Sequence, residues 1–157
     1  MNTGIKLYKE ENHGDPRFGY QNVDIARDFA QKAVVHIEEL AKKLNKTCVV
    51  LGCIDNSSAF LSAFVKQLQP GYVIASGSKY EDKYLRLNGC DDYADDQFLF
   101  IFLDDYIYTG EAVKLALELV EKEFTIDHKQ FYSIVIKKSW IMDPLPEKVN
   151  VIKLCHD

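Results

Sequence analysis

The chain has 157 residues and a formal net charge of -5, and 47% of its residues are hydrophobic. That length and apolar content fit one compact domain with a full core. The acidic balance argues against a general nucleic-acid-binding protein, because phosphate contacts along a nucleic acid need a basic face. It does not argue against small phosphate ligands, which a few lysines and backbone amides are enough to hold.

Hydropathy and the cysteine pattern bear on the cellular setting. The sequence contains no apolar run of about 18 residues, so we expect no membrane span. Residues 1–18 are polar and lack the apolar stretch of a signal peptide. The cysteines form no C-x-x-C pair for zinc or redox chemistry; they are Cys48, Cys53, Cys90 and Cys155. We therefore expect reduced thiols and a cytoplasmic protein.

The first predicted helix follows a polar N-terminal segment (residues 1–23) and begins at Asp24, which is a good N-cap residue. Its apolar positions recur with the spacing of an amphipathic helix. These positions are Ile25, Phe29, Ala33, Ile37, Leu40, Ala41 and Leu44. Asn45 and Lys46 end the helix.

A predicted strand comes next, at residues 48–54 (CVVLGCI), and its nearly continuous apolar run is typical of a parallel strand buried on both faces. Four turn and N-cap residues follow, and they predict the start of a helix over 59–68. They are Asp55, Asn56, Ser57 and Ser58. Pro70 and Gly71 stop that helix, and residues 72–75 form a second predicted strand.

Residues 76–97 show no persistent periodicity, and such a stretch inside a compact domain is usually a functional loop. We predict a mobile loop there. The most apolar run of the chain, FLFIFL at 98–103, then predicts a central strand that ends at Asp104 and Asp105. The remaining predicted elements are a helix at 111–124 and strands at 131–136 and 149–154.

The alternation of strands and helices predicts an α/β fold: a single domain over residues 1–157, with a Rossmann-like parallel sheet of about five core strands flanked by helices. Ligands of such sheets bind at the carboxyl ends of the strands. The loops at 55–58 and 104–110 both lie at that edge, so we expect the functional site there.

The 104–112 segment has the residue types that a sugar phosphate needs. Thr109 and Gly110 open a predicted helix, where backbone N–H groups lack internal partners and the helix dipole favours an anion. Glycine lets the backbone approach a phosphate closely, and the threonine hydroxyl can donate one more hydrogen bond. The carboxylates of Asp104 and Asp105, just upstream, can accept hydrogen bonds from sugar hydroxyls.

The sequence FIFLDDYIYTGEA (residues 100–112) resembles the signature of type I phosphoribosyltransferases, and the order of elements from about residue 24 to 155 resembles the fold of that family. The resemblance implies that Asp104 and Asp105 are the catalytic acid pair, which binds the ribose 2- and 3-hydroxyls of phosphoribosyl pyrophosphate (PRPP). It also implies a loop around the 5-phosphate. That loop consists of Tyr108, Thr109, Gly110, Glu111 and Ala112.

The resemblance assigns further parts of the site. Residues 55–58 take the place of a loop that contacts pyrophosphate, and Lys79, Lys83 and Arg86 lie in the place of a mobile loop that closes over it. Mg²⁺ at Asp104 and Asp105 would offset the charge between pyrophosphate and the sugar hydroxyls. The implied reaction is displacement of pyrophosphate at the anomeric carbon of ribose by a nitrogen nucleophile.

The chain departs from the family pattern at three places. Ala112 lacks a hydroxyl that many members have, Asp55 adds an acid to the pyrophosphate loop, and Tyr108 stands where 6-oxopurine enzymes place an acidic general base. Tyrosine, with a pKa near 10, is a poor base at neutral pH. In the opposite direction, YSIVIKK (132–138) resembles the strand of the same enzymes whose final lysine contacts the purine oxygen. The resemblance implies this role for Lys137, and Trp140 shortly after it could stack on a base.

Three functional hypotheses follow. The first is an enzyme that transfers the 5-phosphoribosyl group from PRPP to a nitrogenous base or similar acceptor. The second is a non-catalytic relative that binds PRPP or a nucleotide as a regulator, through oligomer contacts such as those of a homodimer. The third is a receiver-like signalling domain with a phosphate-accepting aspartate, which is disfavoured because only Asp55 is available as a further acid near the end of the first strand.

Overall fold

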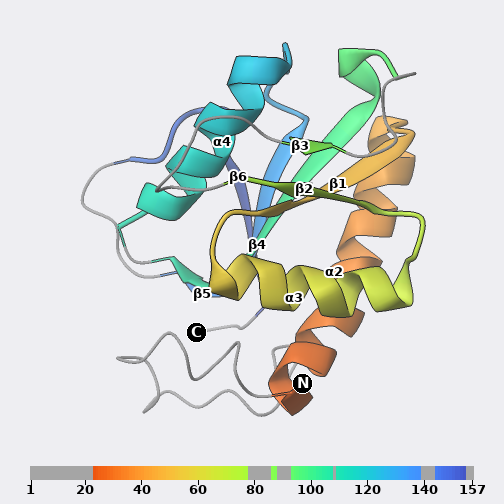
Figure 1. The fold of residues 1–157 in the computed structure, drawn as a ribbon, viewed down its shortest axis with the longest axis vertical. Coiled ribbons are helices and arrows are strands. Elements are labelled where there is room, and N and C mark those ends of the chain that lie inside the picture. The colour runs from red at the N-terminus through yellow and green to blue at the C-terminus, as the bar shows by residue number, and fades with distance from the viewer. Residues whose placement is uncertain (1–22, 78–85, 88–92, 108, 139–143, 155–157) are drawn as a thin grey trace.

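A single sheet organises the part of the chain that the computed structural model describes, which comprises residues 23–77, 86–87, 93–107, 109–138 and 144–154. Six strands form this sheet in the order β3-β2-β1-β4-β5-β6 (Figure 1). The strands are β1 (Cys48–Cys53), β2 (Val73–Ser76), β3 (Arg86–Leu87), β4 (Phe98–Ile107), β5 (Phe131–Lys138) and β6 (Asn150–Lys153). The helices are α2 (Val23–Leu44), α3 (Asn56–Leu68), α4 (Glu111–Glu123) and the short 3-10 helix η2 (Asp95–Gln97).

The strand directions confirm the predicted parallel sheet. β2, β1, β4, β5 and β6 are parallel to one another, and these are the five predicted strands. The sixth strand, β3, pairs antiparallel with β2 at the edge of the sheet. It lies inside the predicted loop at 76–97, and it was not predicted because two residues are too short to show a period. Residues 78–85 and 88–92 of that loop lie outside the described part.

Helices cover both faces of the sheet, as predicted. Along β4, Leu99, Ile101 and Leu103 belong to one buried cluster with α2 and α3. The alternate residues Phe98 and Phe100 belong to a second cluster with α4 on the other face. Figure 1 shows α4 on one side of the strands and α2 with α3 on the other. The unbroken apolar run of β4 is thus explained by burial on both faces.

The helix boundaries agree with the capping signals to within a few residues. α2 begins at Val23 and ends at Leu44, and Asn45 adopts a left-handed conformation with φ 55°, which commonly terminates a helix. α3 begins at Asn56, earlier than predicted, because Asp55 is its N-cap residue. None of the described helices has both the length and the apolar character that crossing a bilayer requires.

The end of β4 was predicted wrongly. The strand does not stop before the acid pair but continues to Ile107, so Asp104 and Asp105 lie within it. The reason is pairing with β5, which itself runs two residues beyond its predicted end. Asp104 is in register with Val135, and Ile107 with Lys138. The ladder with β5 keeps this polar segment extended, and hydropathy alone gives no sign of that.

Candidate functional site

The acid pair of β4 is buried near the carboxyl ends of the strands, next to the start of α3. Asp104 is 7% exposed and Asp105 is 3% exposed. Neighbouring residues of a strand point to opposite faces, yet these two carboxylates come together. Asp104 Oδ1 accepts a hydrogen bond of 2.8 Å from the backbone N–H of Asp105, so the Asp104 side chain folds back along its own strand.

The loop before α3 is closed by a capping box between Asp55 and Ser58. The Ser58 N–H donates to Asp55 Oδ1 over 2.8 Å, and the Ser58 hydroxyl lies 2.7 Å from the same oxygen. The Ser58 hydroxyl oxygen also accepts from the backbone N–H of Asp55 at 3.2 Å and of Ile54 at 3.1 Å. Ser58 is fully buried. Its polar groups are therefore used within the loop, whereas Asn56 is exposed.

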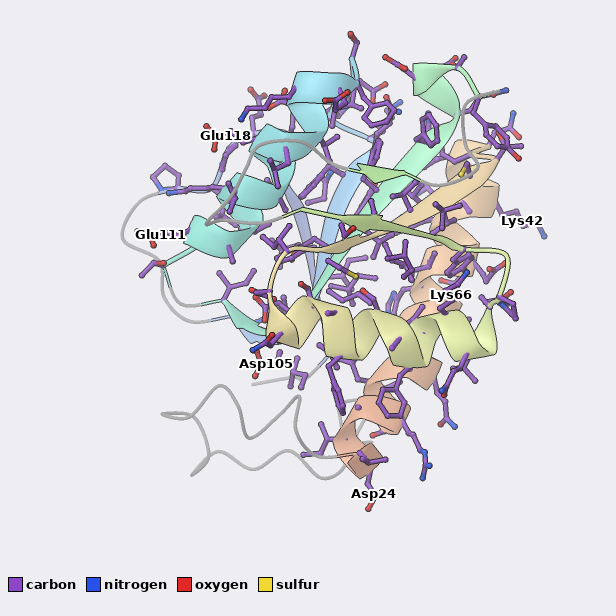
Figure 2. The ribbon with its side chains drawn as sticks, viewed as in Figure 1. Asp24, Lys42, Lys66, Asp105, Glu111 and Glu118 are labelled. Carbon is purple, nitrogen blue, oxygen red and sulfur yellow. The ribbon has the colours of Figure 1, made fainter. Side chains whose placement is uncertain are left out.

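Ser57 connects this loop to the acid pair. Its hydroxyl lies 2.9 Å from Asp104 Oδ1 and 3.2 Å from Asp105 Oδ1, across 47 and 48 residues of sequence. Figure 2 shows Asp105 beside the first turn of α3. The two segments that the sequence placed at the carboxyl edge of the sheet thus meet in the structure.

The start of α4 has the geometry expected of a helix opened by glycine. Gly110 is the N-cap residue, with φ 82° and ψ 4° in the left-handed region. Thr109 Oγ1 accepts a hydrogen bond of 3.3 Å from the Glu111 N–H. Thr109 and Glu111 are exposed, and Ala112 is half-buried. Glu111 adds a carboxylate to the helix start, where the dipole favours an anion (Figure 2).

The acid pair is electrostatically unfavourable in its ionised form. Burial raises the pKa of Asp104 well above its ordinary value, and the neighbouring Asp105 and the charge of Asp55 raise it further. The hydrogen bond from Ser57 acts in the opposite direction and lowers the pKa. A ligand that brings positive charge or hydrogen-bond donors to Asp104 would stabilise its carboxylate.

The residues present fit an Mg²⁺ ion that is bound by only one or two protein carboxylates. Among the described residues, no group of three or more histidine, cysteine or acidic side chains is placed to hold a metal ion. Mg²⁺, however, is commonly bound through one or two carboxylates together with substrate phosphates and water. The buried pair Asp104 and Asp105 supplies such carboxylates.

Several residues implied by the family resemblance lie beyond what the structure describes. Lys79, Lys83, Tyr108 and Trp140 fall outside the described residues. Arg86 and Lys137 belong to β3 and β5, but only their backbone is described. The backbone of Lys137 is in register with Tyr106 of β4, two residues after the acid pair.

One contact of the candidate site, that of Ser57 with the acid pair, was not predicted from the sequence. Residues 55–58 were treated as one pyrophosphate loop, whereas the structure divides them into a capping pair, Asp55 and Ser58, and a bridging residue, Ser57. The capping pair had a usable signal, because an acid and a serine three residues apart before a helix match the spacing of a capping box. The bridge had none, since its partners lie on a distant strand.

No protein-family model matches the sequence, and no curated protein matches it in sequence. Solved structures do share its fold. Adenine phosphoribosyltransferase from Saccharomyces cerevisiae, complexed with adenine and an imino-altritol bisphosphate, matches with a TM-score of 0.54 and 16% identity. The alignment covers 87% of this chain and 82% of the yeast one.

Two further structures agree. Another adenine phosphoribosyltransferase matches with a TM-score of 0.54 and 15% identity over 87% of this chain and 83% of that one. The xanthine-guanine-hypoxanthine phosphoribosyltransferase of Helicobacter pylori matches with a TM-score of 0.51 and 13% identity, over 83% and 88%. The chain therefore has the fold of the type I phosphoribosyltransferases.

Proposed function

We propose that this protein binds a 5-phosphoribosyl group between the acid pair of β4 and the start of α4, and that it transfers this group from PRPP to a nitrogenous base, releasing pyrophosphate. One observation carries the proposal. A buried pair of carboxylates and a helix opened by a left-handed glycine, Gly110, follow one another on a single β-α connection. The fold shared with phosphoribosyltransferases supports it.

Each part of the ligand has a matching group in the chain. Asp104 and Asp105 accept hydrogen bonds from the ribose 2- and 3-hydroxyls, which supply the donors that the buried carboxylates need. The N–H groups of the first turn of α4 and the Thr109 hydroxyl bind the 5-phosphate. At Gly110 no side chain stands between this backbone and the phosphate.

The proposed reaction is a substitution at the anomeric carbon. The bond from that carbon to pyrophosphate breaks, and pyrophosphate leaves with the bonding electrons. A ring nitrogen of the base forms the new bond and loses its proton to solvent. The sugar passes through an oxocarbenium-like state, which the nearby carboxylates stabilise electrostatically. Asp104 and Asp105 are the residues that would hold Mg²⁺, which when bound neutralises charge on the pyrophosphate.

A purine is the first acceptor to test. The solved structures that share the fold include an adenine enzyme complexed with adenine and an enzyme named for xanthine, guanine and hypoxanthine. Lys137 lies on β5 in register with the segment that follows the acid pair. We expect Lys137→Ala to weaken purine nucleotide binding and to spare PRPP. Equal loss of both would reject a purine-specific role for this lysine.

A non-catalytic regulator of the same fold is the second candidate, and the capping box favours it. The carboxylate of Asp55 and the polar groups of Ser58 are engaged with each other, so they are not directed to a pyrophosphate. An acid at this position also repels pyrophosphate. A protein of this kind would bind PRPP or a nucleotide and would not release pyrophosphate.

We also propose a reducing, cytoplasmic setting. Cys53 carries a free thiol. Burial raises the pKa of the Cys53 thiol, so the thiol stays protonated and unreactive at neutral pH.

Titration calorimetry with PRPP, with and without Mg²⁺, tests the proposed ligand. We expect wild-type protein to bind PRPP and Asp105→Asn to bind it at least about tenfold more weakly, the typical effect of a lost hydrogen bond to a charged group. Absence of binding in both conditions would reject the proposal. A panel of bases then separates the two candidates, because pyrophosphate release identifies the transferase and binding without release identifies the regulator.

A further inference from the structure

Among the described residues, Ser57 is the one whose side chain forms hydrogen bonds between the loop before α3 and the acid pair. The Ser57 hydroxyl lies 2.9 Å from Oδ1 of Asp104 and 3.2 Å from Oδ1 of Asp105. A serine hydroxyl has one proton to donate. The two acids therefore share the Ser57 hydroxyl as a donor, and one oxygen of each carboxylate lies against it.

This shared contact fixes how the two carboxylates are turned. The terminal torsion of an aspartate is broad, so a carboxylate without a fixed partner samples many rotations about its Cβ–Cγ bond. A hydrogen bond to one oxygen limits that rotation and thereby sets the direction of the other oxygen. In Asp104 the backbone N–H of Asp105 adds a second restraint at 2.8 Å on the same Oδ1 atom.

The backbone at Ser57 is held in place by groups other than the acids. The capping box between Asp55 and Ser58 fixes the loop and does not use the Ser57 hydroxyl. Ser57 also lies in the first turn of α3, whose next turns pack into the core through Leu61 and Val65. Removal of the hydroxyl is thus expected to take one restraint from the carboxylates without unfolding the loop.

We propose that Ser57 is a positioning residue that orients the Asp104 and Asp105 carboxylates and thereby sets a preference of the site for ribose over 2-deoxyribose; this inference rests on the proposed binding of a 5-phosphoribosyl group. Ribose presents two neighbouring hydroxyls at a fixed spacing, and a pair of pre-oriented acids matches both. A 2-deoxy sugar leaves one buried acceptor unpaired. Sites built to bind a hydroxyl reject analogues that lack it for this reason.

The test compares ribose 5-phosphate with 2-deoxyribose 5-phosphate by titration calorimetry. Wild-type protein should prefer ribose 5-phosphate by about tenfold or more. In Ser57→Ala the preference should fall to about threefold or less, mainly through weaker ribose binding, because the two carboxylates lose the donor that they share. Ser57→Thr keeps a hydroxyl at the same position and should restore the preference.

Ser62→Ala is the matched control, since Ser62 is a fully buried serine of the same helix that lies beside the Cys53 thiol. It should bind both sugars as the wild type does, and thermal melting should show that all variants are folded. Equal weakening of both sugars in Ser57→Ala, or an unchanged preference, would overturn the role of Ser57 while the proposed function stands. A wild-type protein that binds neither sugar phosphate would reject the proposed function and this inference with it.

Discussion

Ser57 Oγ lies 2.9 Å from Asp104 Oδ1, so a helix start and a strand that are 47 residues apart in the sequence meet at a buried carboxylate. Burial raises the pKa of Asp104, and the nearby Asp105 and Asp55 raise it further. Three acids close together in a poorly solvated place oppose folding at neutral pH. Such an arrangement persists when function requires it, because stability is commonly sacrificed at binding sites.

Asp104→Asn should therefore stabilise the protein and impair ligand binding. Replacement of the acid by an isosteric amide removes the repulsion, and we expect the free energy of unfolding at pH 7 to rise by about 1 kcal/mol. Urea denaturation measures this change, and calorimetry should show weaker ribose 5-phosphate binding. Asp96→Asn, at an exposed position of η2, is the control and should alter neither property. A destabilised Asp104→Asn would contradict the assignment of Asp104 as an electrostatically strained group.

The stability difference between Asp104→Asn and the wild type should also depend on pH. The folded-state pKa of Asp104 is raised, so its protonation favours the folded state. That contribution is complete below the unfolded-state pKa of about 3.9 and is lost as pH rises through the folded-state pKa. The advantage of the amide should consequently shrink as pH falls from 7 toward 4. Melting temperatures of both proteins across this range test it, and a constant difference would contradict it.

Much of the fold could be predicted from the sequence because its signals are local. The apolar run at β4 and the spacing along α2 identify these elements without tertiary information, and Gly110 marks the helix start that the structure confirms. The predictions failed where pairing between strands decides how far a strand extends. β4 extends through Asp104 to Ile107 because β5 continues beside it, and a polar strand end is invisible to hydropathy.

The candidate site was predictable in its parts and not in its connections. Asp104, Thr109 and Gly110 could be proposed as site residues from residue type and spacing, since a β-α connection is contiguous in sequence. The bridge from Ser57 depends on the order of strands, which places β1 beside β4 and brings their carboxyl ends together. A serine in a turn gives no sign of such a partner, and its expected contact with pyrophosphate stays a prediction.

Loss of the capping box should destabilise the protein. In Ser58→Ala the backbone N–H groups of Ile54 and Asp55 lose their acceptor, and the Asp55 carboxylate loses one of its donors. We expect the free energy of unfolding to fall by about 1–2 kcal/mol, as for substitutions that remove a helix-capping hydrogen bond. Ser133→Ala is the comparison, because Ser133 Oγ is buried and has no hydrogen-bond partner among the described residues. Equal effects of the two substitutions would show that the capping box adds nothing.

Gly110→Ala should weaken both the fold and the phosphate site. The left-handed φ of 82° costs a residue with a Cβ atom about 1 kcal/mol, so the melting temperature should fall. The added methyl group would also stand at the helix start where the 5-phosphate is proposed to bind. We expect affinity for ribose 5-phosphate to drop by about tenfold or more, while a ligand without the phosphate, ribose itself, should bind unchanged.

Gly71→Ala supplies the control for this prediction. Gly71 has no positive φ, and a Cβ atom built there meets no atom within 4 Å. Its substitution should leave the melting temperature and the ribose 5-phosphate affinity as in the wild type. If Gly110→Ala lowered the melting temperature and retained full affinity, the start of α4 would be a structural turn only, and the phosphate would have to bind elsewhere. If it lowered affinity alone, a close approach of phosphate to the backbone at Gly110 would be the direct explanation.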